Sequence, residues 1–242
     1  MNAERQAGAG EVVVAFEGVT KRLGGRLVLD GLTFSVRRGE IFAIVGPSGT
    51  GKSVTLKHIV GLLEPDGGRV VCASRRVGYL FQSGALLAWL TAYENVALPL
   101  VEAAGLSDSE ADARVTDALR AVGLEDAADR YPSEMSGGMQ KRVGLARVLV
   151  RDADVILYDE PTSGLDPVTS ASISRLIRNV RDTRGATSVL VTHDLAGALR
   201  LADRIMLLKD GRNVLCAPPD EFRASRDPTA MEFLAAAKGE GI

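Results

Sequence analysis

The most informative stretch of this sequence is Gly46-Pro47-Ser48-Gly49-Thr50-Gly51-Lys52-Ser53. It fits the pattern G-x-x-x-x-G-K-[ST], whose glycines let successive backbone N–H groups converge on phosphate oxygens. We expect Lys52 to reach the β- and γ-phosphates of a nucleotide as a point charge, and the hydroxyl of Ser53 to hold Mg²⁺. A plain structural glycine loop is the alternative, and the position of the pattern between a strand and a helix argues against it.

Short apolar strands alternate with helical patterns on both sides of this loop. The strand Ile41–Val45 runs directly into it, and a helical pattern that begins near Val54 follows. Further strands are predicted at Val155–Tyr158, Thr187–Val191 and Ile205–Leu208, the last joined by a hairpin turn at Asp210-Gly211 to Asn213–Leu215. This alternation is typical of an α/β fold with a mostly parallel sheet, which binds ligands at the carboxyl ends of its strands.

Carboxylates stand at one of those strand ends. Asp159 and Glu160 directly follow Val155–Tyr158. Asp159 would fix the metal directly or through water, and Glu160 could orient and deprotonate an attacking water. A solvated acidic strand end is the alternative for such a pair. A small-molecule kinase would share the phosphate loop but would not need the second acid.

Three further segments give predictions of antiparallel strands or of helices. Val12–Val36, with alternating apolar residues and a Gly24-Gly25 turn, predicts antiparallel strands in which Phe16 is a core residue. Between Gln82 and Lys141 the pattern turns helical, with a capping box from Ser107 to Glu110. We interpret this middle segment as a helical subdomain inserted into the α/β core. Asp166 caps another helix, which Gly185 ends.

Composition excludes several classes of protein. The 242 residues carry 29 Lys+Arg and 31 Asp+Glu, a net charge of −2, with 46% hydrophobic residues, which is ordinary for a soluble globular protein. No apolar run reaches the ~18 residues of a membrane span, so we expect the chain not to cross a membrane by itself. The basic residues form no large cluster, which argues against a nucleic-acid partner. Cys72 and Cys216 are predicted to be free thiols in a reducing cytosol.

A second glycine-containing stretch gives the family resemblance. Met135-Ser136-Gly137-Gly138-Met139-Gln140 is similar to the signature LSGGQ. Ser136 is a plausible N-cap and the two glycines let backbone approach a phosphate, so the stretch is a second candidate anion site. With the carboxylates and His193 following at the right distances, nearly the whole chain resembles the nucleotide-binding subunit of an ATP-binding cassette (ABC) transporter.

The resemblance implies a fold and an activity. The fold is a P-loop NTPase with a RecA-like α/β core, a mostly parallel sheet, a small antiparallel β subdomain and the inserted helical subdomain. It makes residues 1–242 one nucleotide-binding domain, with the core at about 1–82 and 143–242 and the helical subdomain at about 83–142. The activity is ATP hydrolysis coupled to transport, with ATP and Mg²⁺ bound.

The resemblance also assigns site residues, in groups. The catalytic residues are Glu160, the switch histidine His193 and Lys52. The ATP-binding residues are Gly46, Pro47, Ser48, Gly49, Thr50, Gly51, Lys52, Ser53 and Val54. The metal would be held by Ser53, Asp159 and Gln82 of the Q-loop. The signature residues are Ser136, Gly137, Gly138 and Met139, and the D-loop is Ser163, Gly164, Leu165 and Asp166. In this family the signature of one subunit faces the phosphate loop of another, which implies a homodimer around two ATP molecules.

The chain departs from the family pattern in three ways. Leu23 stands where an aromatic residue often stacks on adenine, so use of GTP stays open. The stretch Gly68–Gln82 is shorter than usual, which predicts a trimmed antiparallel subdomain. Met139 replaces the glutamine of the signature.

Short motifs indicate the kind of transporter. Met139, together with Phe81–Leu86 and Glu94–Leu100, is similar to the ATPases of phospholipid transporters that work with MCE-domain proteins, the Mla-type system. This resemblance implies a cytoplasmic subunit on the inner face of the inner membrane, held there by a separate permease and working with an MCE-domain lipid-binding protein. Ala85–Leu90, which holds the only Trp of the chain, forms either the groove for a permease helix or ordinary core.

Several alternatives remain at this point. The chain could power transport of amino acids, metals or lipoproteins. It could also be an ABC protein that acts on DNA or ribosomes, although those usually carry two fused cassettes or a long coiled insertion. The transported substrate and the direction of transport do not follow from the sequence.

Overall fold

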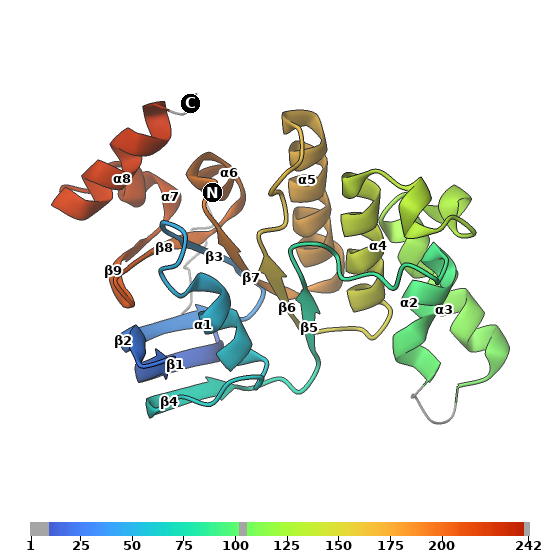
Figure 1. Ribbon diagram of the computed structural model, residues 1–242, viewed down its shortest axis with the longest axis horizontal. Coiled ribbons are helices and arrows are strands. Elements are labelled where there is room, and N and C mark those ends of the chain that lie inside the picture. Colours follow the sequence, from blue (N-terminus) through green and yellow to red (C-terminus); the bar gives the residue numbers. More distant parts are fainter. Residues whose placement is uncertain (1–9, 102–105, 240–242) are drawn as a thin grey trace, which may run out of the picture.

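The strand that precedes the phosphate loop lies in the interior of the larger of two sheets. A computed structural model describes residues 10–101 and 106–239 (Figure 1). Its six-stranded sheet has the order β5-β6-β7-β3-β8-β9. The strands are β3 (Ile41–Val45), β5 (Val77–Leu80), β6 (Val155–Asp159), β7 (Thr187–Thr192), β8 (Arg204–Lys209) and β9 (Arg212–Ala217).

The neighbouring strands pair in parallel from β5 to β8, and only β8 and β9 are antiparallel. The predicted strands before the phosphate loop, before Asp159 and before His193 are therefore confirmed, as is the hairpin at Asp210-Gly211. Because parallel strands end at the same sheet edge, β3, β6 and β7 deliver the candidate site residues side by side. The sequence analysis did not predict β5.

Each face of this sheet is covered by its own core. In β3, Ile41, Ala43 and Val45 belong to one buried cluster, while Phe42 and Ile44 belong to the other. The first cluster includes residues of α4 (Gly137–Leu149), α5 (Pro167–Arg184) and α6 (Leu195–Leu201); the second includes residues of α1 (Lys52–Ile59) and the smaller sheet. This continuous apolar run is what a strand buried on both faces requires.

The smaller sheet is antiparallel and has the order β2-β1-β4. Its strands are β1 (Val12–Leu23), β2 (Arg26–Arg37) and β4 (Gly67–Cys72). Both turn glycines between β1 and β2 have positive φ, 55° at Gly24 and 81° at Gly25, as the predicted tight turn requires. Phe16 is buried at 1% exposure and stacks on Phe34, which confirms that it is a core residue.

Helices gather at one end of the molecule, away from the carboxyl-terminal helix α8 (Pro228–Gly239) (Figure 1). They are α2 (Ala92–Val101) and α3 (Asp108–Ala121), with short 3-10 turns at Glu125–Ala127 and Pro132–Glu134, and α4 follows. The capping box of α3 is present between Ser107 and Glu110. The predicted subdomain boundary at about 142 falls inside α4, which runs through it unbroken.

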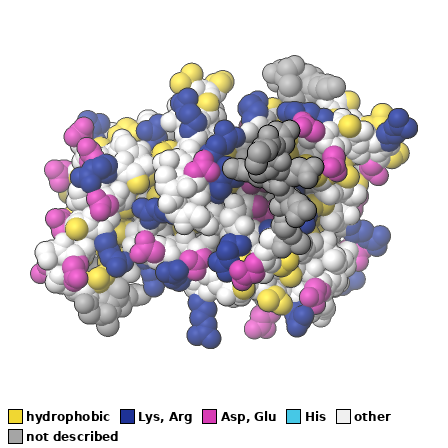
Figure 2. Space-filling view, turned by 180° about the vertical axis from the view of Figure 1, so that it is seen from behind, with side chains coloured by type: hydrophobic (Ala, Val, Ile, Leu, Met, Phe, Trp, Pro, Cys, Tyr) yellow, Lys and Arg dark blue, Asp and Glu magenta, His cyan; other side chains and the backbone are white. Residues whose placement is uncertain are grey.

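Among the described residues, no helix is both long and apolar enough to cross a membrane. The face seen in Figure 2 carries Lys and Arg side chains interspersed with Asp and Glu. A phosphate backbone laid on that face would meet carboxylates as well as cations. The remaining helix, α7 (Pro219–Arg223), links the larger sheet to α8.

Candidate functional site

The phosphate loop adopts a conformation that only glycine allows at two points. Gly46 has φ 154°, and a Cβ there would stand 2.2 Å from the backbone oxygen of Leu208. Gly51 has φ 101°, and a Cβ there would stand 2.9 Å from a methyl carbon of Leu29. Pro47, Ser48 and Gly49 between them are exposed. The loop is thus held at its ends by the surrounding strands and presents its middle to solvent.

Lys52 is the first residue of α1, whose N-terminus has no side-chain cap. Its ammonium is buried at 7% exposure and donates to the backbone oxygens of Gly46 (2.8 Å) and Pro47 (3.0 Å). Burial lowers the pKa of Lys52, and the carboxylates of Glu160 and Asp159 oppose that effect. The positive end of α1 and this ammonium therefore converge on the concave side of the loop, where an anion is favoured.

Ser53 and Asp159 form a small oxygen donor set. The Ser53 hydroxyl donates to Oδ1 of Asp159 at 2.8 Å, and the Tyr79 hydroxyl donates to Oδ2 at 2.9 Å. The described residues contain no cluster of three or more His, Cys, Asp or Glu that could hold a metal by itself. One hydroxyl and one carboxylate beside a phosphate loop fit Mg²⁺, which binds through one or two carboxylates plus substrate phosphates.

Glu160 and His193 meet at the same sheet edge. Nδ1 of His193 lies 2.8 Å from Oε2 of Glu160, and the other carboxylate oxygen of Glu160 lies 3.9 Å from the Lys52 ammonium. The Glu160 side chain is 13% exposed, whereas that of His193 is 60% exposed. Glu160 has a φ of +48°, a left-handed backbone conformation that is uncommon outside glycine. Such a conformation is often found where the surrounding structure forces a functional side chain into place.

Ser163 of the D-loop connects three parts of the site. Gln82 donates to its hydroxyl at 3.3 Å, and the buried ammonium of Lys141 on α4 donates to its backbone oxygen at 2.6 Å and to the backbone oxygen of Glu160 at 3.3 Å. Gln82 thus lies beside the D-loop, and its predicted contact with the metal stays a prediction. Lys141 and Tyr79 lie outside the motif positions that carry chemistry, so their contacts with the site were not predicted from the sequence.

The signature residues lie apart from the phosphate loop of the same chain. Ser136 caps α4 as predicted, with its hydroxyl accepting from the backbone N–H of Met139 at 3.3 Å. A Cβ on Gly138 would stand 2.4 Å from Thr169 at the start of α5. Figure 1 shows the start of α4 well separated from α1. Within one chain, the second candidate anion site is therefore not opposite the first.

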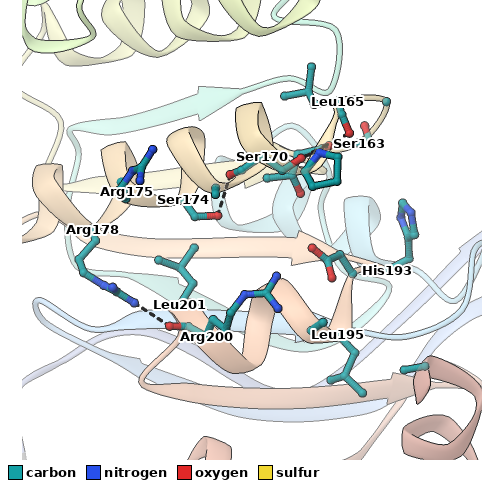
Figure 3. A pocket seen from close by; sticks show the side chains of 17 residues that line it. Ser163, Leu165, Ser170, Ser174, Arg175, Arg178, His193, Leu195, Arg200 and Leu201 are labelled. Carbon is teal, nitrogen blue, oxygen red and sulfur yellow. Dashed lines mark hydrogen bonds between the residues drawn. The ribbon is translucent and has the colours of Figure 1, made fainter. Parts of the chain in front are cut away.

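Two clefts of about 610 Å³ border the site. One lies between α5 and α6, beside the D-loop and His193, with Arg175, Arg178 and Arg200 along it (Figure 3). Its wall is stiffened by Arg178, whose guanidinium donates to the backbone oxygen of Arg200 at 2.6 Å. The other lies beside Asp159 and is lined by Lys57, Tyr79, Phe81, Gln82, Ser83, Asp159, Ser163 and Gly164.

Comparison with known proteins finds one matching family and several similar chains. Residues 29–163 match the family described as ABC transporter. The Arabidopsis thaliana chloroplast protein TRIGALACTOSYLDIACYLGLYCEROL 3 is 38% identical over 92% of this chain and 73% of its own length. The probable ribonucleotide transport ATP-binding protein mkl of Mycobacterium leprae is 37% identical over 92% and 69%. The methionine import ATP-binding protein MetN of Bordetella pertussis is 42% identical over 88% and 63%.

Two solved structures are similar to this chain over most of its length. The cbiO1 protein of Clostridium perfringens, part of the ABC transporter complex cbiONQ, has a TM-score of 0.82 at 30% identity over 90% of this chain and 92% of that chain. The ATP-binding cassette MJ0796, solved as a dimer bound to ADP and Pi, has a TM-score of 0.76 at 34% identity over 85% and 98%.

Proposed function

This chain belongs to the ABC transporter family, and from that premise we propose that it powers phospholipid transport through a separate membrane permease with an MCE-domain partner. It is an ATP-binding and ATP-hydrolysing subunit, and its substrate is ATP with Mg²⁺. The observation that carries the catalytic part of the proposal is the convergence of Lys52, Glu160 and His193 at one sheet edge.

The chain's own residues would divide the work at this site. The backbone N–H groups of residues 46–53, with Val54 following, would hold the phosphates, and the Lys52 ammonium would compensate their charge. When bound, Mg²⁺ would neutralise charge on the β- and γ-phosphate oxygens between Ser53 and Asp159. Gln82 would orient the metal or the water from the Q-loop.

Glu160 would act as the general base. Its carboxylate is shielded from solvent, and one of its oxygens is in contact with His193. In the proposed role, Glu160 accepts the proton of the attacking water, and His193 holds the carboxylate in place and contacts the γ-phosphate. His193 is exposed enough to reach a ligand without any displacement of the sheet.

We propose that two copies close around two ATP molecules. Cassettes of this family dimerise, and Ser136, Gly137, Gly138 and Met139 lie apart from the phosphate loop of their own chain. The signature of one copy would complete the site of the other, with the D-loop, Ser163 to Asp166, between them. ATP would favour the closed dimer because it contacts both copies, and its hydrolysis would release them.

Trp89 supports a docking site for the permease. It is 72% exposed, and it follows Gln82 in the segment Ala85–Leu90, in which Ala85 and Ala88 are exposed as well. An exposed indole is far more common at an interface than on an isolated surface. We propose that a permease helix covers this segment and holds the subunit at the inner face of the inner membrane.

The lipid part rests on the relatives and on Met139. The Arabidopsis relative is named after trigalactosyldiacylglycerol, a glycerolipid, whereas the other relatives are named for ribonucleotide transport and for methionine import. The latter names make methionine import or ribonucleotide transport the second candidate. Phe81–Leu86 and Met139 resemble the Mla-type group, and this resemblance favours phospholipid transport over the second candidate.

Affinity capture of the tagged chain from membranes of its own cells tests the proposal. We expect a polytopic permease and an MCE-domain protein to copurify, and ATP hydrolysis by the reconstituted complex to depend on phospholipid. Stimulation by methionine or a ribonucleotide, without an MCE-domain protein, would favour the second candidate. Copurifying ribosomes would exclude transport altogether.

A further inference from the structure

The carboxylate of Asp159 is held from two sides. Ser53 donates to Oδ1 at 2.8 Å, and the Tyr79 hydroxyl donates to Oδ2 at 2.9 Å. Ser53 belongs to the phosphate loop, whereas Tyr79 belongs to none of the motifs of the site. The motifs of the site therefore do not account for the hydrogen bond from Tyr79 to Asp159.

Sheet register brings the two side chains together. Tyr79 on β5 pairs with Leu157 on the parallel strand β6, and Asp159 lies two residues beyond Leu157. Side chains two residues apart project from the same face of a strand, so Tyr79 and Asp159 are diagonal neighbours. The Tyr79 hydroxyl spans this diagonal and reaches the Asp159 carboxylate.

The Tyr79 ring is fixed in place. It packs against the buried cluster beneath α1, and its centroid lies 4.4 Å from that of Phe81. Tyr79 also lines the cleft beside Asp159, where its hydroxyl donates to the carboxylate. A ring packed against these neighbours restricts the direction of its hydroxyl more than a flexible side chain such as lysine would.

The chemistry of the phenol suits a site that must attract a cation. The Tyr79 hydroxyl that donates to Asp159 is an uncharged donor. A neutral donor orients the carboxylate and leaves its negative charge uncompensated. An ammonium or guanidinium in the same place would cancel part of the attraction for a divalent cation.

We propose that Tyr79 is a positioning residue for Mg²⁺ that fixes the Asp159 carboxylate with one oxygen turned toward Ser53. The proposal rests on the metal-holding role proposed above for Ser53 and Asp159. With Oδ2 tied to the phenol, the carboxylate cannot rotate its charge away from the phosphate loop. Groups that orient metal ligands in this way typically change metal affinity 10–100-fold when removed.

The test compares two proteins that both carry Glu160→Gln, so that nucleotide is not consumed. One of them also carries Tyr79→Phe, and the other, which keeps Tyr79, is called the unchanged chain for this test. Phenylalanine keeps the ring and its packing on Phe81 and removes one oxygen. We expect the Mg²⁺ concentration that half-saturates binding of a fluorescent ATP analogue to rise about tenfold. Binding of the analogue without metal should be unchanged. Free Mn²⁺ counted by electron paramagnetic resonance gives a second, independent measure of metal affinity.

Tyr93→Phe is the matched control. Its hydroxyl donates to Asp112 at 3.0 Å, also a phenol–carboxylate bond, but between α2 and α3. We expect this variant to keep the unchanged chain's Mg²⁺ requirement, and both variants to unfold at similar temperatures. An unchanged Mg²⁺ requirement in Tyr79→Phe, or an equal rise in both variants, overturns the role of Tyr79. Failure of the unchanged chain to bind the analogue at all would overturn the proposed function itself.

Discussion

Glu160 combines a shielded carboxylate with a left-handed backbone, and both properties depend on its place after β6. Its N–H donates to the backbone oxygen of Val191 on β7 at 3.0 Å, which ties the strained residue to the neighbouring strand. The strain is therefore maintained by the sheet, and a substitution that keeps the side-chain shape leaves it unaltered. The role of the carboxylate can then be tested apart from the fold.

Glu160→Gln keeps the shape and removes the ability to accept a proton. We expect hydrolysis to fall about 10²–10⁴-fold, because this is the usual contribution of a general base. ATP binding should persist, and the ATP-bound dimer should accumulate. Phosphate release and size-exclusion chromatography with ATP measure the two effects. Glu221→Gln, on the exposed side of α7, is the control, and unchanged turnover in Glu160→Gln would exclude this carboxylate as the base.

At the scale of the element, α1 connects the phosphate loop to the core beneath the smaller sheet. One turn after Lys52 and Ser53, its last turn buries His58, which is 3% exposed and has its ring 6.4 Å from that of Phe16. Nδ1 of His58 lies 2.7 Å from the backbone oxygen of Val54. Burial lowers the pKa of His58 below its ordinary value. The helix that carries the phosphate loop is thus packed through a histidine that the folded state keeps neutral.

This burial predicts a pH dependence of stability. The unfolded chain takes up the His58 proton near the ordinary pKa of about 6.5, and the folded chain takes it up only at lower pH. The contribution of His58 to stability is therefore complete above about pH 6.5 and is lost as the pH falls below it, by up to about 1.4 kcal/mol per pH unit. Urea unfolding at pH 8 and pH 5.5 should show a smaller loss in His58→Leu than in the unchanged chain. Equal losses would contradict this explanation.

Across the whole molecule, two of the exposed large apolar residues lie at the segment where we propose that the permease docks. Trp89 and Phe81 flank the segment after the Q-loop, at 72% and 40% exposure. Gln82 lies between them and donates to Ser163. A helix that docked on this segment would therefore be connected to the D-loop and to Glu160 through a few hydrogen bonds.

Trp89→Ala should separate hydrolysis from attachment. We expect it to reduce capture of the permease at least tenfold, since buried tryptophans at interfaces are commonly worth 2 kcal/mol or more. Hydrolysis by the isolated subunit should change little, because the side chain is exposed there. Leu62→Ala, three residues after the end of α1 and 61% exposed, is the control. Full capture of the permease by Trp89→Ala would place the docking site elsewhere.

The sequence was enough to predict the phosphate-loop and signature motifs, the caps of α3, α4 and α5, and most strands of the larger sheet. These features are local. A loop motif, a cap or an apolar run is complete within some ten residues, so the residue types that it needs can be recognised in the sequence. The buried position of Phe16 followed from simple alternation in the same way.

The contacts around the site became visible only in the folded chain. Tyr79 and Asp159 are 80 positions apart, and Lys141 and Ser163 are 22 apart. Their contacts depend on strand order and register, and β5 itself, Val77–Leu80, has a glycine at its second position and so lacks the continuous apolar run of the strands that were predicted. Sequence motifs predict which residues contact the ligand. The side chains that hold those residues in place, such as Tyr79 and Lys141, come from distant parts of the chain and can be identified only in the folded structure.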